Sequence, residues 1–203
     1  AASDVYKRQV LNYLLLLGWA PEGEQEIFSL DEMIKIWDPA RISKSPAIFD
    51  PLKLRAINAA YIRALPAEEF RKLADPFIDQ AVHVQIDRDL LCANLQPRCE
   101  VLEDIPPQLD FFDAVLPIDA EMYRNKKQKT TPESAKEALS ALLPVLEAQT
   151  DWSRDAIFEA CKQKAEAMEK KNGWLLFPLG IALSGKARTP GGGTDLAAMM
   201  GKE

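Results

Sequence analysis

The sequence has few of the side chains that most often do chemistry in a small enzyme. It contains three widely spaced cysteines without a C-x-x-C pair, and a single histidine, His83. Such scattered cysteines argue against a disulfide framework or a zinc site and fit a reducing cytoplasm. Any Cys–His or Ser–His catalytic pair would need His83, which no motif surrounds, so we predict a surface or packing role for this residue.

The chain also lacks an excess of positive charge and a long apolar run. Its 25 basic and 31 acidic residues give a formal net charge of −6, so a nucleic-acid surface would have to be a local cluster of lysine and arginine. The longest apolar run, Leu14–Leu17 with Trp19 beyond it, is too short to span a bilayer. No signal peptide is recognisable, and the polar, charged residues 1–9 are set apart as a candidate non-native stretch.

Helical patterning runs through almost the whole length. Alternating runs of β-branched residues are missing, and apolar residues recur at spacings of three and four, so we predict an all-α fold. Pro97 should interrupt a helix, and the main internal boundary is expected between Ile105 and Lys129. The predicted helices are Val10–Gly18, Ser29–Trp37, Asp50–Leu65, Pro66–Leu73, Ile86–Glu103, one from Thr130, one from Ser153 to Asn172–Gly173, Leu175–Ser184 and one from Thr194.

The clearest helix start is Asp50–Pro51. A carboxylate at the N-cap accepts hydrogen bonds from free backbone N–H groups, and proline at the first helical position lacks a donor that would otherwise stay unpaired. The expected buried face contains Leu54, Ile57, Tyr61 and Leu65, with Lys53, Arg55 and Arg63 outside it. Further helix starts are predicted at Ser29–Glu32, Thr130–Glu133 and Thr194, and helix ends at Gly18, Asn172–Gly173 and Gly185.

Few segments invite a chemical interpretation. The glycines of Thr189–Thr194 could cradle a phosphate, but the lysine and the strand of a P-loop are missing, so a flexible turn is the prediction. Arg124–Lys129 holds four cations in six residues, which fits either a contact to a phosphate backbone or a solvated loop. Paired carboxylates such as Asp110 and Asp113 lack a partner histidine or metal-ligand spacing. No constellation supports covalent, acid–base or metal chemistry.

Four islands spread over the chain carry a family resemblance. They are Leu-Asn-Tyr-Leu-Leu-Leu-Leu-Gly-Trp at Leu11–Trp19 with Ile27–Leu30; Ser-Pro-Ala-Ile-Phe-Asp-Pro at Ser45–Pro51 with Lys53–Leu54, Asn58 and Tyr61–Arg63; Leu-Gln-Pro-Arg at Leu95–Arg98 with Val101–Leu102; and Ala182–Gly185 with Thr189–Gly191 and Met200–Glu203. In this order they resemble the non-catalytic C-terminal half of bacterial glutamyl-tRNA synthetase, a class I aminoacyl-tRNA synthetase.

The resemblance decides how Arg41–Ser45 is interpreted. Its string Arg-Ile-Ser-Lys-Ser is similar to the Lys-Met-Ser-Lys-Ser signature that steadies ATP phosphates in class I synthetases. In the family, that signature precedes a segment like Val10–Trp19, so we interpret Arg41–Ser45 as a false match. The His-Ile-Gly-His signature and a nucleotide-binding half are missing too. We therefore expect a fragment that is inactive alone and holds no cofactor, with ATP and Mg²⁺ belonging to the parent enzyme.

The resemblance implies a stem-contact helical region at residues 10–56 and two anticodon-binding subdomains at residues 57–125 and 126–203. Together they would grip the anticodon arm of tRNA(Glu). Arg98 occupies the place of the family's arginine that reads the last anticodon base. A guanidinium offers only hydrogen-bond donors, and cytosine offers O2 and N3 as acceptors. Guanine at this position would turn its own donors toward the guanidinium, which would disfavour tRNA(Gln). The alternative for Arg98 is a salt-bridged helix residue.

Other residues follow from the same resemblance. Thr189 and Pro190 match a family loop near the anticodon, whereas Gly180 stands where the family carries an arginine, and Ala56 where it carries a tryptophan. Candidate contacts to the tRNA backbone are Lys44, Arg63, Lys126, Lys127 and Lys129. The expected partner is tRNA(Glu), without DNA or membrane, bound by a cytoplasmic monomer. The alternative is a free-standing helical tRNA-binding or protein-interaction module without catalysis.

Overall fold

The computed structural model describes residues 2–19, 23–44 and 47–202, and it divides into two compact units. The first unit takes its residues from Ala1–Pro76 and Gln96–Ile105, and the second from Phe77–Leu95 and Pro106–Glu203. The described residues form helices and short 3₁₀ turns without a strand, which confirms the all-α prediction. Within them, no helix is long and apolar enough to cross a membrane.

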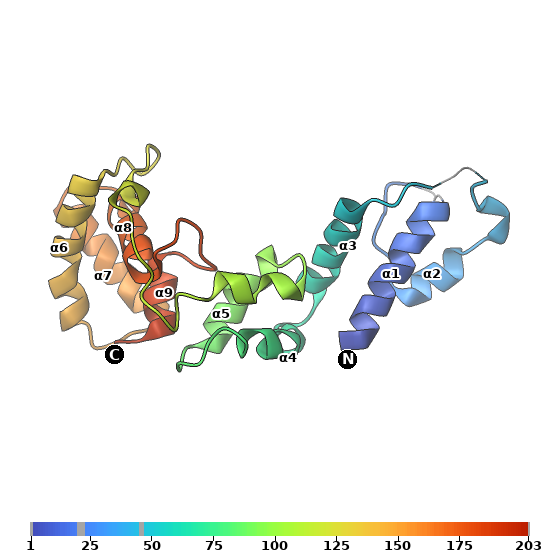
Figure 1. Ribbon diagram of the computed structural model, residues 1–203, viewed down its shortest axis with the longest axis horizontal. Coiled ribbons are helices and arrows are strands. Elements are labelled where there is room, and N and C mark those ends of the chain that lie inside the picture. The colour runs from blue at the N-terminus through green and yellow to red at the C-terminus, as the bar shows by residue number, and fades with distance from the viewer. Residues whose placement is uncertain (1, 20–22, 45–46, 203) are drawn as a thin grey trace. The chain divides into compact units, whose positions relative to one another are not determined.

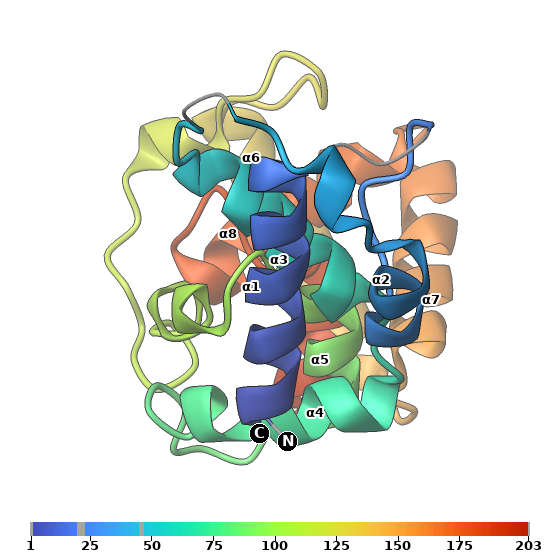
Figure 2. The same cartoon turned by 90° about the vertical axis from the view of Figure 1, so that its right-hand side faces the viewer.

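The first unit is built around α1 (Ala2–Gly18), which packs against α2 (Leu30–Ile36) and α3 (Pro51–Ala64) (Figures 1 and 2). Its apolar cluster consists of Leu15, Trp19, Phe28 and Met33. α1 ends at Gly18 as predicted but begins at Ala2 rather than Val10. The earlier start has a packing reason, because Gln9 in the preceding turn is itself buried.

A buried polar network fastens α1 to the segment before α2. Asn12 is fully buried, and its amide donates to the carbonyl of Glu26 at 2.7 Å while its Oδ1 accepts from the backbone N–H of Phe28 at 2.7 Å. The Tyr61 hydroxyl of α3 donates to the Phe28 carbonyl at 2.5 Å. Because the segment at Glu26–Phe28 belongs to no helix, these side chains supply hydrogen bonds to backbone groups that have no helical partner.

The local start signals of α2 and α3 are confirmed. Ser29 and Glu32 form a capping box, and the Asp50 carboxylate accepts from the backbone N–H groups of Leu52 at 2.9 Å and Lys53 at 3.2 Å. The buried face of α3 differs from the prediction, since Leu54, Tyr61 and Leu65 are only half-buried. Its fully buried residues are Ile57, Asn58, Ala59 and Ile62. The face is centred differently because α3 also buries the polar side chain of Asn58.

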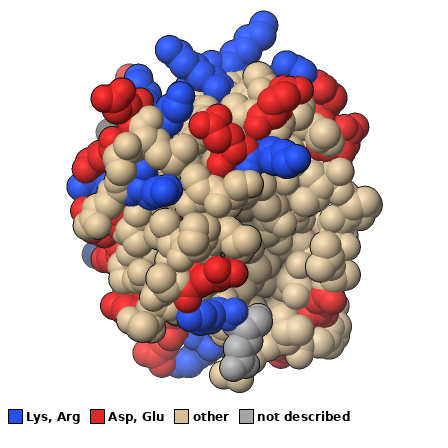
Figure 3. Space-filling model, turned by 90° about the vertical axis from the view of Figure 1, so that its left-hand side faces the viewer, with Lys and Arg blue, Asp and Glu red and all other residues tan. Residues whose placement is uncertain are grey.

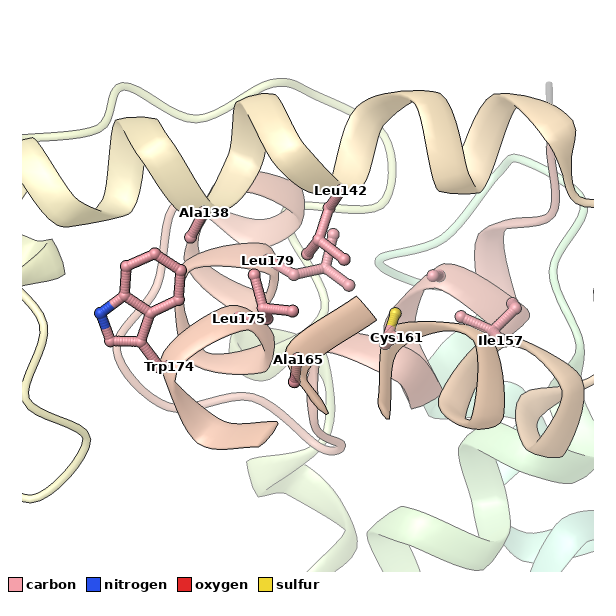
Figure 4. Packing of buried hydrophobic residues seen from close by; sticks show 9 residues of the cluster. Ala138, Leu142, Ile157, Cys161, Ala165, Trp174, Leu175 and Leu179 are labelled. Carbon is pink, nitrogen blue, oxygen red and sulfur yellow. The ribbon is translucent and has the colours of Figure 1, made fainter. Parts of the chain in front are cut away.

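The second unit is a bundle of α6 (Pro132–Ala148), α7 (Arg154–Ala167), α8 (Asn172–Ser184) and α9 (Gly193–Met200), with α5 (Arg88–Leu95) against α9. Its main cluster is drawn in Figure 4: side chains from α6, α7 and α8 converge between the helices. The cluster consists of Ala138, Leu142, Ile157, Cys161, Ala165, Trp174, Leu175, Leu179 and Ala197. The starts predicted within Thr130–Glu133 and at Ser153 are confirmed, with Thr131 as the N-cap of α6, and so is the end at Gly185, with φ 64°.

Three further predicted helix limits, those of α4, α7 and α9, are wrong. α4 (Ala67–Ile78) continues past Leu73, because Phe70, Ala74 and Ile78 are all fully buried along it. Pro97 does interrupt the helix, and η2 (Gln96–Arg98) follows α5.

The other two errors concern small residues near helix ends. α7 ends at Ala167, the chain turns at Glu169 with φ 54°, and Asn172–Gly173 begins α8 instead of ending α7. The reason is that Trp174 and Leu175 must enter the same core as α7. Gly192, not Thr194, is the N-cap of α9. The predicted terminal residue Glu203 lies outside the described part.

Candidate nucleic-acid interface

Arg98 lies at the end of η2 with its side chain exposed. The turn is fastened by Gln96, whose amide Nε2 donates to the carbonyls of Ile62 at 3.0 Å and Leu65 at 2.8 Å. Both carbonyls lie at the end of α3, where a helix leaves carbonyl groups without their usual i+4 partners. Gln96 therefore uses the end of α3 as the anchor for the turn that presents Arg98.

The chain is held on the other side of Arg98 as well. The Asn58 amide of α3 donates to the carbonyl of Glu100. Between Arg98 and Glu100, the buried Cys99 donates its thiol hydrogen to the carbonyl of Val101 at 3.3 Å. Burial, reinforced by nearby carboxylates, raises the pKa of Cys99 to about 12, so the thiol stays protonated and serves packing rather than nucleophilic chemistry. Arg98 thus projects from a backbone fixed on both sides.

Arg55 balances the acidic groups beside this turn. Its Nε donates to Glu100 at 3.0 Å and its terminal nitrogen pairs with Asp104. The hydrogen bonds with Glu100 and then Asp104 raise the pKa of Arg55 above its usual value. Arg55 is therefore an internal partner of the first unit rather than a solvated cation. Its pairing reduces the negative charge that a phosphate backbone near Arg98 would meet.

The predicted Thr189–Pro190 element belongs to the second unit, in the loop before α9. The Thr189 hydroxyl donates to the carbonyl of Gly191 at 2.6 Å, and Pro190 is buried. The N–H of Gly192 donates to Asp195 at 2.8 Å, and an added Cβ at Gly191 would lie only 2.6 Å from the Cβ of Asp195. The loop is thus packed onto the first turn of α9, which is more order than the predicted flexible turn.

The basic segment at 124–129 forms a compact turn. Asn125 and Thr130 exchange two backbone hydrogen bonds of 3.0 Å, and the Asn125 carboxamide oxygen accepts from the N–H groups of Lys127 and Gln128. Lys126, Lys127 and Lys129 are exposed. Lysine and arginine side chains project from the upper edge of the face shown in Figure 3, which belongs to the second unit. The turn therefore offers its lysines on an ordered backbone.

The remaining predicted residues are divided between the units. Lys44 and Arg63 are exposed residues of the first unit, to which Arg98 also belongs. Gly180 lies within α8 of the second unit, where an added Cβ would be 3.5 Å from the backbone nitrogen of Gly193. No general sequence signal distinguishes the two amides that hold the Arg98 turn, Gln96 and Asn58, from solvated ones.

The residues that could suggest other chemistry have structural partners in the described part of the chain. The guanidinium of Arg41 lies 4.9 Å from the centre of the Trp19 ring, and this packing fits the interpretation of Arg41–Ser45 as a false match to the ATP signature. Ser45 lies outside the described residues. His83 is exposed and pairs with Asp113. In the part of the chain that the structure describes, no group of three or more His, Cys, Asp or Glu side chains could hold a metal ion. We assign none of these residues to ATP or Mg²⁺.

Comparisons with known proteins show which family the sequence resembles. The family described as "Anticodon binding domain" matches residues 58–203, and "tRNA synthetases class I (E and Q), catalytic domain" matches residues 1–56. The glutamate–tRNA ligase of Clostridium botulinum (strain Hall) is 43% identical over 202 residues, which cover 100% of this chain and 42% of that protein. The Clostridium acetobutylicum ligase is 43% identical over 198 residues, covering 97% and 41%.

A solved structure shows the same fold. The crystal structure of a glutamate tRNA ligase from Elizabethkingia meningosepticum in complex with its amino acid matches with a TM-score of 0.80 at 26% identity, covering 96% of this chain and 38% of that one. These matches define the class, an anticodon-binding domain joined to class I synthetase sequence. The chain belongs to the glutamate–tRNA ligase family. It spans about two fifths of the length of the relatives it matches, namely 42% of the Clostridium botulinum protein.

Proposed function

We propose that this chain recognises the anticodon arm of tRNA(Glu) as the C-terminal part of a glutamate–tRNA ligase. The match of the anticodon-binding family to residues 58–203 carries the proposal. The anchored, exposed Arg98 supports it, since a reader of a base needs a fixed backbone and a side chain that solvent can reach. The whole protein would attach glutamate to tRNA(Glu) with ATP and Mg²⁺ as a cytoplasmic monomer. We expect no aminoacylation by this chain alone.

Within this proposal, residues 10–56 contact the stem of the tRNA, and the subdomains at residues 57–125 and 126–203 grip the anticodon arm. Thr189 and Pro190 lie beside the anticodon, with the buried Pro190 shaping the loop and Thr189 the closer of the two to solvent. Contacts to the sugar–phosphate backbone come from Lys44, Arg63, Lys126, Lys127 and Lys129. No observation on the described residues favours a free-standing module.

Arg98 reads the last anticodon base in this proposal. Its guanidinium donates to the O2 and N3 acceptors of cytosine, the base at that place in tRNA(Glu). Guanine, at the same place in tRNA(Gln), would turn N1–H and N2–H₂ donors toward it and leave donors facing donors. Discrimination then rests on the free-energy cost of leaving these donors unpaired in the complex, which exceeds the cost of losing a contact that water can replace.

The test measures affinity for tRNA(Glu), tRNA(Gln) and tRNA(Glu) with its last anticodon base changed to guanine. The unaltered chain should prefer tRNA(Glu). Arg98→Ala should weaken tRNA(Glu) binding by about 1–3 kcal/mol and abolish the preference. Arg98→Lys should keep much of the affinity but lose discrimination, because lysine lacks the planar fork.

Arg71→Ala is the matched control. Arg71 lies on α4 of the same unit, where its Nε donates to Asp75 at 3.2 Å. Its loss removes the same charge from a different helix, α4, so the preference should persist. Equal affinity of the unaltered chain for all three RNAs, or an Arg98→Ala variant that still discriminates, would refute the reader assignment.

A further inference from the structure

A second group of lysines lies beside the 125–130 turn, although it is 40 or more residues away in sequence. Lys170 and Lys171 immediately precede α8, and both are exposed. Gln128 from the turn packs directly on Gly173 in the first turn of α8: an added Cβ at Gly173 would lie 1.8 Å from the Gln128 Oε1. The contact brings the two basic segments together.

We propose that these two segments form one surface that binds the phosphate backbone of tRNA. The lysine surface consists of Lys126, Lys127, Lys129, Lys170 and Lys171. The proposal rests on the function proposed above and adds a partner-binding element that includes Lys170 and Lys171. Its role is affinity without base selection, since contacts to phosphates fix position but carry no sequence information.

The positive charges of the lysine surface are not neutralised by ion pairs among the described residues. Some lysines elsewhere are paired: Lys72 lies 2.7 Å from Glu68 and Lys162 lies 3.4 Å from Glu159. By contrast, none of the five lysines of the lysine surface has a carboxylate within ion-pair distance among the residues that the structure describes. In a chain with a net charge of −6, unpaired cations gathered from two segments repel one another, and an anion relieves that repulsion.

Two acidic residues lie beside these segments along the chain. Glu121 is occupied by Arg124, whose Nε donates to it at 2.7 Å. Glu169 is exposed at the left-handed turn before Lys170, where φ is 54°. Lys170 is itself held in place, because its amine lies 5.1 Å from the centre of the Trp174 ring and Trp174 is buried in the core of the unit.

An RNA backbone fits this surface better than a lipid surface does. Membrane-surface segments combine lysines with exposed apolar side chains that enter the lipid. None of the exposed large apolar residues falls within 121–134 or 168–176 of the described chain. The observed combination, ordered lysines on polar turns, is what a repeating array of phosphates requires.

The test uses the whole 203-residue chain and a double variant with one lysine from each segment, Lys127→Gln/Lys171→Gln. In about 0.1 M salt, tRNA(Glu) affinity should fall about tenfold, and the slope of log K against log salt should become shallower by about 1.5–2, as for two lost phosphate contacts. The affinity ratio between tRNA(Glu) and the RNA with a changed last anticodon base should not move.

The matched control is Lys72→Gln/Lys162→Gln, which removes the same charge from two ion-paired lysines. It should leave affinity and salt slope nearly unchanged. If Lys127→Gln/Lys171→Gln behaves like this control while Arg98→Ala still impairs binding, the lysine surface is refuted and the proposed function stands. If the unaltered chain binds no tRNA, or binds vesicles of anionic phospholipid instead, both the surface's partner and the proposed function are refuted.

Discussion

At the scale of single residues, three uncharged amides connect parts of the first unit that are distant in sequence. Asn12 pairs with Glu26 and Phe28, while Asn58 and Gln96 fasten the two sides of the Arg98 turn. A net contribution of about 1 kcal/mol per hydrogen bond is typical, but a buried carbonyl left unpaired costs about 1–3 kcal/mol. The presentation of Arg98 therefore depends on side chains other than its own.

A carboxylate has the corresponding role in the second unit. Asp113 accepts from the backbone N–H groups of His83 at 2.8 Å and Val84 at 3.3 Å, and it also pairs with the His83 ring. The backbone hydrogen bond from His83, followed by the one from its side chain, lowers the pKa of Asp113 below its usual value. The charged form is thus favoured by folding, so its contribution is complete above the unfolded-state pKa of about 3.9.

We expect Asp113→Asn to lower the free energy of unfolding at pH 7 and to matter less as pH falls. Below about pH 4 the unaltered chain also loses this contribution, progressively, as pH passes through the lowered pKa of folded Asp113. Urea unfolding at a series of pH values between about 7 and 2.5 measures both chains. Asp155→Asn, at an exposed carboxylate paired with Arg154, is the control with little effect. A difference that stays constant with pH would contradict the assignment.

At the scale of helices, the sequence predicts a start best where a side chain caps it locally. The caps at Ser29, Asp50, Thr131 and Ser153 depend on residues within three positions, so local chemistry suffices for them. Asn172–Gly173 carries an equally clear local signal, but the packing of the following Trp174 and Leu175 makes it a start instead of an end. Local signals identify a boundary, and tertiary packing decides which side of it is helical.

Gly180 of α8 and Gly193 of α9 lie where the two helices meet, and they differ in the space around them. An added Cβ at Gly193 would lie 2.6 Å from the Leu176 carbonyl oxygen and 2.9 Å from the Gly180 nitrogen, both backbone atoms. At Gly180 the nearest atoms are 3.5 and 3.6 Å away, an ordinary contact. Only Gly193 is therefore required for the close approach of the two helices.

We expect Gly193→Ala to destabilise the second unit by about 1–3 kcal/mol, because backbone must move to admit the methyl group. Gly180→Ala should stabilise it by up to about 1 kcal/mol, because alanine suits a helix interior better. Thermal or urea unfolding of the two variants beside the unaltered chain measures the opposite signs. Equal destabilisation by both would show that the helices approach each other differently from this description.

At the scale of the whole molecule, the pairings that build the candidate interface join distant parts of the chain. Gln96 bonds across 34 residues to Ile62, and Asn58 across 42 residues to Glu100. Arg98 itself could be predicted from its short motif, whereas these anchors could not, because nothing within a few residues specifies them. The proposed Lys170 and Lys171 could not be predicted for the same reason, since their proximity to the basic turn exists only after α8 packs.

The chain also passes between its two units three times, after residues 76, 95 and 105, yet each unit has an apolar cluster of its own. We expect Leu175→Ala, at a fully buried position of the second unit, to cost about 2–5 kcal/mol there. Ile57→Ala, at a site 2% exposed in α3, should do the same in the first unit. Because each cavity removes contacts inside one unit, its effect should stay local.

Amide hydrogen exchange separates the two effects. Leu175→Ala should accelerate exchange in α6, α7 and α8 and leave α1 and α3 protected, while Ile57→Ala should give the reverse pattern. Each variant serves as the control for the other, because both delete apolar volume of similar size from a helix. If either substitution accelerates exchange equally in both units, the three chain crossings couple them into one cooperative body, and a lesion far from Arg98 would then disturb its turn as well.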